Sequence, residues 1–537
     1  MQLRNMEEVA QRLEHLKARL IKVCEISGIP GCSIGVIHHG ETVWKANLGY
    51  RDVERQLSPQ SDTMFNLDSC TKAITAAGLG CLVADGKVQW TTPVRDILPE
   101  FGALGDIIDS LITPLDLLSM RSGHTMLDSL SWQGNNHIFF DKADTVTLWN
   151  ATPRLGSFRS SYIYNNWGYA IIGIVIETLS GKKLHDFLKE KFFDPLHLSR
   201  TKMTDFTPDD NSSLCYAVLD DMTPVTIPAP AIGNNVFMEG ASGLLSTIDD
   251  LMVLYSSFVT AINDQLARQS NSTKDNPFKE CGTLIKGHSF LENSMVLREQ
   301  SYGCGWIRCE LPGPLGMISM NPTLVSMPEA AKGSPSHLCI YHQGLMPGSS
   351  ANVALLPETE TVVAVLANSS PLGDGADWLS QMILEEVLES PVRHNYEDLA
   401  RQAASKVFDH IPSMHRTQES SRKLGTKPSL GLKDYAGRYL HNTTGFWIEI
   451  KAQGEALSIA FMGLGIETYE LRHYEHDTFS WLMSYNDAAR RGRFVHYYNS
   501  EHFLIRFEGV DRGIDRFYWH ASRDTGPEPY LFLKAQV

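Results

Sequence analysis

Residues 65–72 read FNLDSCTK and run directly into the apolar residues 73–77, AITAA. Ser69 stands three positions before Lys72, at the predicted start of an apolar helix that follows a hydrophobic, strand-like run. Residues three apart are neighbours on one helix face, so the Lys72 amine can lie beside the Ser69 hydroxyl. A serine hydroxyl needs a nearby proton acceptor to act as a nucleophile, and a buried lysine of lowered pKa can be that acceptor. The N–H groups at the helix start would stabilise an oxyanion.

The serine–lysine spacing is not specific by itself. Residues 180–183 (SGKK) and 420–423 (SSRK) have the same form. The first segment lies where a helix is expected to end at Gly181, and the second lies in a polar, basic linker. Ser69 opens an apolar helix, although a capping serine and a solvated lysine would explain the pair equally well if it stood alone.

The composition is that of a soluble, globular chain. With 537 residues, two or three domains are expected. A formal net charge of −15 argues against nucleic acid or an anionic membrane as the main partner. No run of about 18 apolar residues predicts a membrane span, and no apolar segment near the N-terminus predicts a signal peptide.

The cysteines and histidines predict neither disulfides nor a metal. Nine scattered cysteines without a CxxC pair fit a reducing, cytoplasmic location. His473 and His476 are close in sequence but have no further ligand at a convincing spacing. We therefore expect no metal and no cofactor, and the oligomeric state stays open.

The order of strand-like and helical segments predicts a split α/β domain. Strand-like runs at 32–37 and 42–48 come first, and four more follow between residues 302 and 367. We expect an α/β part at about 1–80 and 241–390, with a helical part at about 81–240 inserted into it. Together they are expected to form one domain, 1–390.

The C-terminal third follows a different pattern. Residues 391–431 are expected to form a linker with one helix, 396–408. Short alternating runs from residue 446 onward, one of them at 493–498, are separated by turns rich in Gly, Asn and Asp. This spacing predicts an antiparallel β-barrel or sandwich at 432–537.

Two later segments carry chemistry of their own. Residues 162–167, YIYNNW, precede an apolar helix; a tyrosine can exchange protons with a lysine, although an aromatic loop capped by an asparagine is the ordinary alternative. Residues 340–345, IYHQGL, lie on a predicted strand. Gly344 there would allow close approach of another backbone, and the N–H of Leu345 would point at a substrate carbonyl. For that segment taken alone, a bulged edge strand with an incidental histidine is the better explanation.

Taken in order, three motifs resemble those of the serine β-lactamase and penicillin-binding-protein superfamily. The motifs are Ser69-x-x-Lys72, Tyr164-x-Asn166 and His342-x-Gly344. They are most similar to the class C β-lactamase-like branch, which includes D-peptidases, DD-carboxypeptidases, esterases and acyltransferases. The resemblance covers roughly residues 8–390, and four flanking matches extend it: 117–123, 168–170, 243–251 and 302–306. The tail, from the segment 432–439, resembles the lipocalin-like domain appended to some members.

The resemblance implies a role for each motif residue. Ser69 would be acylated, while Lys72 and Tyr164 would share the proton transfers, and the sequence leaves open which of them is the base. The implied oxyanion hole is formed by the backbone N–H groups of Ser69 and Leu345. The implied substrate-binding residues are Asn166, His342 and Gly344. His342 stands where many relatives have lysine, which is more like the peptidase members than the β-lactamases.

The favoured function is therefore a serine acyl-enzyme hydrolase of an ester or amide, including peptides that contain D-residues. The substrate would be a small-molecule or peptide acyl compound. An acyltransferase or thioesterase-like enzyme, which passes the Ser69 acyl group to an alcohol or amine, would use the same residues. A non-catalytic ligand-binding protein on the same fold is the third alternative.

Overall fold

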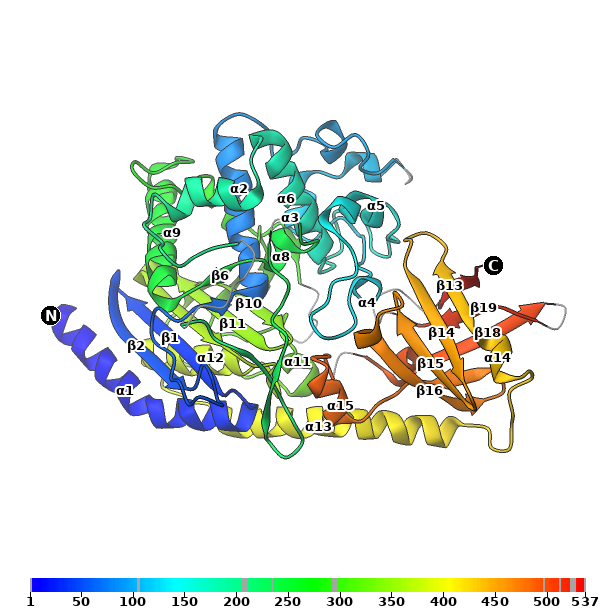
Figure 1. The fold of residues 1–537 in the computed structure, drawn as a ribbon. Coiled ribbons are helices and arrows are strands. Elements are labelled where there is room, and N and C mark those ends of the chain that lie inside the picture. The colour runs from blue at the N-terminus through cyan, green and yellow to red at the C-terminus, as the bar shows by residue number, and fades with distance from the viewer. Residues whose placement is uncertain are drawn as a thin grey trace.

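The computed structural model describes residues 2–103, 107–203, 211–233, 235–291, 298–495, 498–510, 513–521 and 528–535. A larger α/β part and a C-terminal barrel lie side by side, joined along one edge by a long helix (Figure 1). Within these residues, no helix combines the length and the apolar character needed to cross a membrane. The same residues hold no group of three His, Cys, Asp or Glu side chains placed to bind a metal ion.

An antiparallel, eight-stranded sheet forms the centre of the larger part. Its strand order is β2-β1-β12-β11-β10-β9-β8-β7. The first two strands of the chain therefore lie beside the last strand of this part, with Cys32 opposite Ala367. The strands are β1 (Gly31–His38), β2 (Glu41–Gly49), β7 (Ser289–Phe290), β8 (Ser301–Tyr302), β9 (Ile307–Leu311), β10 (His337–Met346), β11 (Ser349–Leu356) and β12 (Thr361–Ala367). The fold class predicted from the sequence is confirmed.

Helices cover both faces of this sheet, which explains why its central strands are continuously apolar. Every residue of β1 and β12 is buried. Helices α1 (Gln2–Ser27) and α12 (Gly375–Val387) pack together, and α12 contacts β11 and β12, while α9 (Ile248–Arg268) contacts β1 and β12.

Helix α2 (Thr71–Ala84) lies at the centre of the inserted part and is buried almost all round. A helix without a polar face belongs in a protein interior. It packs against α6 (Asn166–Ser180), α7 (Leu184–Leu188), α8 (Glu239–Ser242) and α10 (Cys281–Ile285).

The expectation that 81–240 is mainly helical was wrong in detail. Its remaining helices are short: α3 (Pro114–Leu118), α4 (Asp128–Ser131) and α5 (Thr145–Asn150). A hairpin of β4 (Cys215–Val218) and β5 (Pro224–Ile227) also lies there. The connections between these elements leave α4 as a loop-borne turn beside the start of α6, and this placement shapes the candidate site.

The linker is mostly one helix, α13 (Tyr396–Ser421), and not a helix ending at 408. Buried Ala400, Val407, Ile411 and Met414 continue the helical spacing past that point, and Pro412 lies inside the helix without ending it. The helix packs against α1 and then reaches the barrel, where Gln418 Nε2 donates to Ser500 O at 2.9 Å (Figure 1). Tertiary packing on two partners therefore stabilises a helix that the sequence pattern alone underestimates.

The C-terminal part is a closed barrel in which each strand pairs with the next and β13 pairs with β20. Aromatic rings fill its interior; for example, Phe517 stacks on Phe532 with ring centroids 4.7 Å apart. A strand was expected at 493–498. Residues 493–495 and 498 do not form one, and residues 496–497 lie outside the described residues. The strands are β13 (Gly437–His441), β14 (Trp447–Gln453), β15 (Ala456–Phe461), β16 (Thr468–Glu475), β17 (Thr478–Ser480), β18 (Leu504–Val510), β19 (Gly513–Trp519) and β20 (Tyr530–Lys534).

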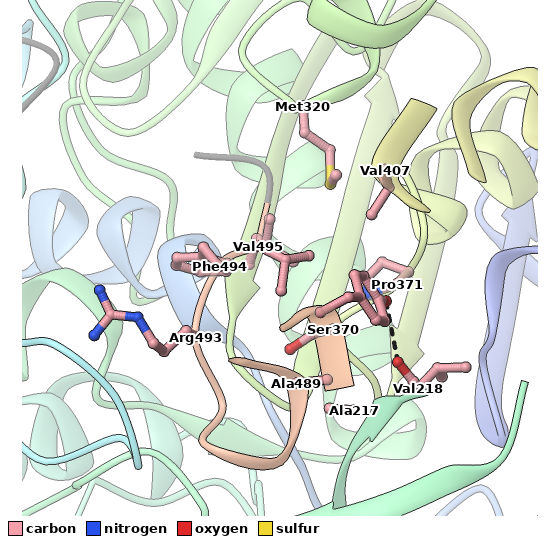
Figure 2. Close-up of a pocket in the computed structure, with 12 residues that line it drawn as sticks. Ala217, Val218, Met320, Ser370, Pro371, Val407, Ala489, Arg493, Phe494 and Val495 are labelled. Atoms are coloured by element: carbon pink, nitrogen blue, oxygen red, sulfur yellow. Dashed lines mark hydrogen bonds between the residues drawn. The ribbon is translucent and has the colours of Figure 1, made fainter. Parts of the chain in front are cut away.

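The loop around Arg493 docks the barrel onto the larger part. The Arg493 side chain is buried, and its guanidinium donates to Gln133 Oε1 at 2.9 Å and to Tyr469 OH at 3.2 Å. Figure 2 shows a small cavity at this junction, lined from both parts, with Arg493 directed away from the other labelled side chains. Leu345, at the end of β10, also lines the cavity. The strand that carries the third sequence motif and the loop around Arg493 therefore line one cavity.

Candidate active site

Three motif residues from two segments meet at the Ser69 hydroxyl. Ser69 lies in the 3₁₀ turn Asp68–Cys70 that leads into α2, and Lys72 lies on the first turn of that helix. Lys72 Nζ is 2.9 Å from Ser69 Oγ, and the Tyr164 hydroxyl, just before α6, donates to the same oxygen at 2.9 Å. One hydroxyl thus has both an amine and a phenol within hydrogen-bond distance, which is the geometry of an activated nucleophile.

The environment of Lys72 favours the neutral amine. The residue is 0% exposed, and burial lowers its pKa to about 7, while the negative charge of Asp128 and smaller effects of Cys70 and Asp68 act in the opposite direction. Nζ donates to the Ala241 carbonyl of α8 at 3.0 Å. The titratable groups that surround it are Asp68, Cys70, Asp128, Tyr164, Tyr169 and His342. A group with a pKa near 7 can take up and release a proton at neutral pH.

Tyr164 is shifted the other way. Burial raises the pKa of its phenol, and the hydrogen bond to Ser69 only partly offsets this. The ring lies 5.1 Å from Lys72 Nζ. At neutral pH Tyr164 therefore keeps its proton, whereas a substantial share of Lys72 has lost one.

Strand β10 passes directly against the nucleophile turn at Gly344. A Cβ atom at this position would lie 2.4 Å from Leu67 O and 3.2 Å from Ser69 N. Only glycine allows so close an approach. The next residue along the strand is Leu345, so the predicted pair of N–H donors, on Ser69 and Leu345, lies on two segments in direct contact.

Asn166 and its neighbour have distinct roles at the start of α6. Asn165 caps the helix, since its side chain accepts from Trp167 N at 2.8 Å and from Gly168 N at 3.2 Å. Asn166 Nδ2 instead donates to Asp128 Oδ2 at 3.4 Å. The predicted substrate-binding amide thus lies beside a carboxylate.

Sequence analysis missed Asp128. Its Oδ1 accepts from Trp167 Nε1 at 3.0 Å, and its charge is the largest electrostatic effect opposing the lowered pKa of Lys72. Asp128 follows the flanking match at 117–123 but stands on a loop-borne turn far from the other motifs in sequence. No spacing rule connects it to them, so only the fold identifies it.

His342 is buried next to Tyr164, with ring centroids 6.4 Å apart. The ring is 0% exposed, Nδ1 donates to Gln343 O at 2.6 Å, and Nε2 accepts from Tyr302 OH at 2.9 Å. Burial lowers its pKa to about 3, and the Lys72 charge adds to this effect. A neutral imidazole with both nitrogens bonded offers no charge to a substrate, so the predicted binding role of His342 gains no support from this geometry.

A model of the Beta-lactamase family matches residues 9–385, so the chain belongs to that family. This result and the fold confirm the resemblance to the β-lactamase and penicillin-binding-protein superfamily. Residues 421–532 match a second model, a domain of unknown function named DUF3471, which coincides with the closed barrel. At the level of the family, the match supports a hydrolase.

Two relatives and one solved structure are similar to the chain over most of its length. Unguisins hydrolase ungD' of Aspergillus campestris (strain IBT 28561) is 26% identical over 431 residues, which is 77% of this chain and 73% of that protein. The human serine beta-lactamase-like protein LACTB, mitochondrial, is 20% identical over 432 residues, 68% of this chain and 78% of that protein. The octameric penicillin-binding protein homologue from Pyrococcus abyssi has a TM-score of 0.55 at 18% identity, covering 97% of this chain and 99% of that one, a likeness of fold alone.

Proposed function

We propose that the protein is a serine acyl-enzyme hydrolase of an ester or amide carbonyl, with Ser69 as the nucleophile. The observation that carries this proposal is the single hydroxyl held at 2.9 Å from both a buried lysine amine and a tyrosine phenol. Family membership and a relative named as a hydrolase support it.

The opposite pKa shifts of Lys72 and Tyr164 support the following proton transfers. Neutral Lys72 takes the proton of Ser69 as Oγ attacks the carbonyl, and the N–H groups of Ser69 and Leu345 stabilise the oxyanion. When the tetrahedral intermediate collapses, Tyr164 gives its proton to the departing alcohol or amine and regains one from the Lys72 ammonium. Water then attacks the acyl-enzyme, and Lys72 accepts its proton before returning one to Ser69.

Asn166 is proposed to bind the amide of a peptide substrate, since its side chain lies at the start of α6 beside the nucleophile's segment. Peptides with a D-residue next to the scissile bond are the substrate class we would test first. The net charge of −15 supports a small-molecule or peptide substrate over nucleic acid or an anionic membrane surface. A reducing, cytoplasmic location remains our proposal from the nine scattered cysteines.

The test compares the wild type with Ser69→Ala on a fluorogenic ester and on a pair of peptides differing only in D or L configuration. We expect the variant to lose at least about 10³-fold in kcat, and a fluorophosphonate probe to label only the wild type. Adding an alcohol or amine acceptor distinguishes hydrolysis from transfer: a product carrying the acceptor would establish acyl transfer. A wild type with neither turnover nor labelling would favour a ligand-binding protein.

A further inference from the structure

Asp68, the residue directly before the nucleophile, has an unusual backbone and a fully buried side chain. Its φ is 49°, in the left-handed region, and its side chain is 0% exposed. Aspartate enters this region more easily than most residues, but the conformation still carries some cost. None of the three sequence motifs includes Asp68, and the proposed proton transfers do not use it.

The carboxylate bonds to the turn that joins β10 and β11. Ser349 Oγ lies 2.9 Å from each carboxylate oxygen, and the backbone N–H of Met346 also donates to the group. Met346 is the last residue of β10 and follows Leu345, while Ser349 is the first residue of β11. One side chain therefore connects the neighbour of Ser69 to the neighbour of Leu345.

This connection matters because the two oxyanion donors belong to segments that are far apart in the sequence. Stabilisation by such donors depends on their lying about 2.7–3.1 Å from the developing oxyanion. The contact at Gly344 stops β10 from moving closer to the turn, since even a Cβ there would lie 2.9 Å from Asp68 Cβ. Hydrogen bonds oppose separation of the two segments: Cys70 Sγ donates to His342 O at 3.6 Å, and the bonds of Asp68 act at the end of β10 next to Leu345.

We propose that Asp68 is a positioning residue of the oxyanion hole, which holds the N–H of Leu345 at a fixed distance from the N–H of Ser69. The proposal rests on the hydrolase function proposed above. Burial raises the pKa of Asp68 to about 7, although the bonds from Ser349 and Met346 and the charge of Lys72 act in the opposite direction. The role is therefore tested by how a substitution divides its effect between kcat and KM, and by binding of a tetrahedral adduct, which a general loss of packing would not change selectively.

The chain offers a variant that separates backbone from side chain. Asp68→Gly keeps the left-handed backbone without strain and removes every bond of the carboxylate. We expect kcat for the ester to fall about 10- to 100-fold, with the enzyme concentration taken from fluorophosphonate labelling of Ser69. KM should change little, because the N–H of Leu345 is displaced and not removed. Asp68→Asn, which retains one acceptor oxygen and tolerates the same backbone, should recover part of the loss.

A pair of adjacent serines provides the matched control. Ser349→Ala removes the hydroxyl bonded to Asp68, whereas Ser350→Ala removes a buried hydroxyl that has no hydrogen-bond partner among the residues that the structure describes. We expect Ser349→Ala to reduce kcat and to weaken binding of a phenylboronic acid, which forms a tetrahedral adduct, by similar factors. Ser350→Ala should change neither.

The outcomes separate this inference from the function on which it rests. Wild-type turnover together with an unchanged kcat in Asp68→Gly, or equal losses in Ser349→Ala and Ser350→Ala, would overturn the role of Asp68 alone. Absence of both turnover and Ser69 labelling in the wild type would overturn the hydrolase function and this role together. If Asp68→Gly fails to fold, the Asp68→Asn and Ser349→Ala variants decide, because each preserves most of the buried contact.

Discussion

The pH dependence of acylation tests whether Lys72 is the base. With its pKa at about 7, the unprotonated fraction of Lys72 is about 0.09 at pH ~6 and about 0.9 at pH ~8. The acylation rate constant should therefore rise about tenfold between these values and then level off. A lysine with the ordinary pKa of about 10.4, or Tyr164 with its raised pKa acting as the base, would give a rise of about 100-fold without levelling off.

The assay is kcat/KM for a fluorogenic ester from pH ~5.5 to ~9.5 at constant ionic strength, with labelling by a fluorophosphonate measured in parallel. Asp128→Asn is the diagnostic variant, because the Asp128 charge raises the pKa of Lys72. Its acid limb should move to lower pH, while the shape of the profile is kept. A wild-type profile with a slope of one up to pH ~9 would refute the assignment of Lys72, and an unmoved limb in Asp128→Asn would refute the electrostatic explanation.

Three further substitutions test the geometry. Tyr164→Phe should lower kcat about 10²- to 10⁴-fold, measured with the same ester, while fluorophosphonate labelling is reduced less, since fluoride leaves that probe without first being protonated as the ester's alkoxide must be. Gly344→Ala would place a methyl group 2.4 Å from a backbone oxygen; it should abolish turnover or lower the midpoint of denaturant unfolding, and normal values of both would contradict the close approach. Arg493→Met leaves Gln133 Oε1 without the guanidinium donor and should weaken the attachment of the barrel to the larger part. Trypsin should then cleave the exposed loop after α13 faster than in the wild type.

Local sequence pattern and the family resemblance were enough to predict the two main architectures and three residues that the fold brings together. Periodicity showed strands on both sides of a helical insertion, and alternating short runs predicted the barrel, because apolar spacing reflects which face of an element is buried. The order of the three motifs named Ser69, Lys72 and Tyr164, which the fold brings to one point. The extent of α13 was underestimated because its second half is stabilised by contacts with the barrel, which no local pattern reports.

The tertiary structure decided the pKa of Lys72 and the surroundings of the proposed nucleophile. The lowered pKa of Lys72 and the position of Asp128 depend on segments that fold around the amine from elsewhere in the chain. The surroundings of His342 also depend on the fold. The motif predicts a contact with substrate, whereas the fold buries the ring between Tyr164 and Tyr302. A sequence determines which side chains are present and how apolar and polar residues are spaced along each helix or strand. Desolvation and hydrogen bonding act between atoms within a few ångströms, so they are fixed only when distant segments pack together.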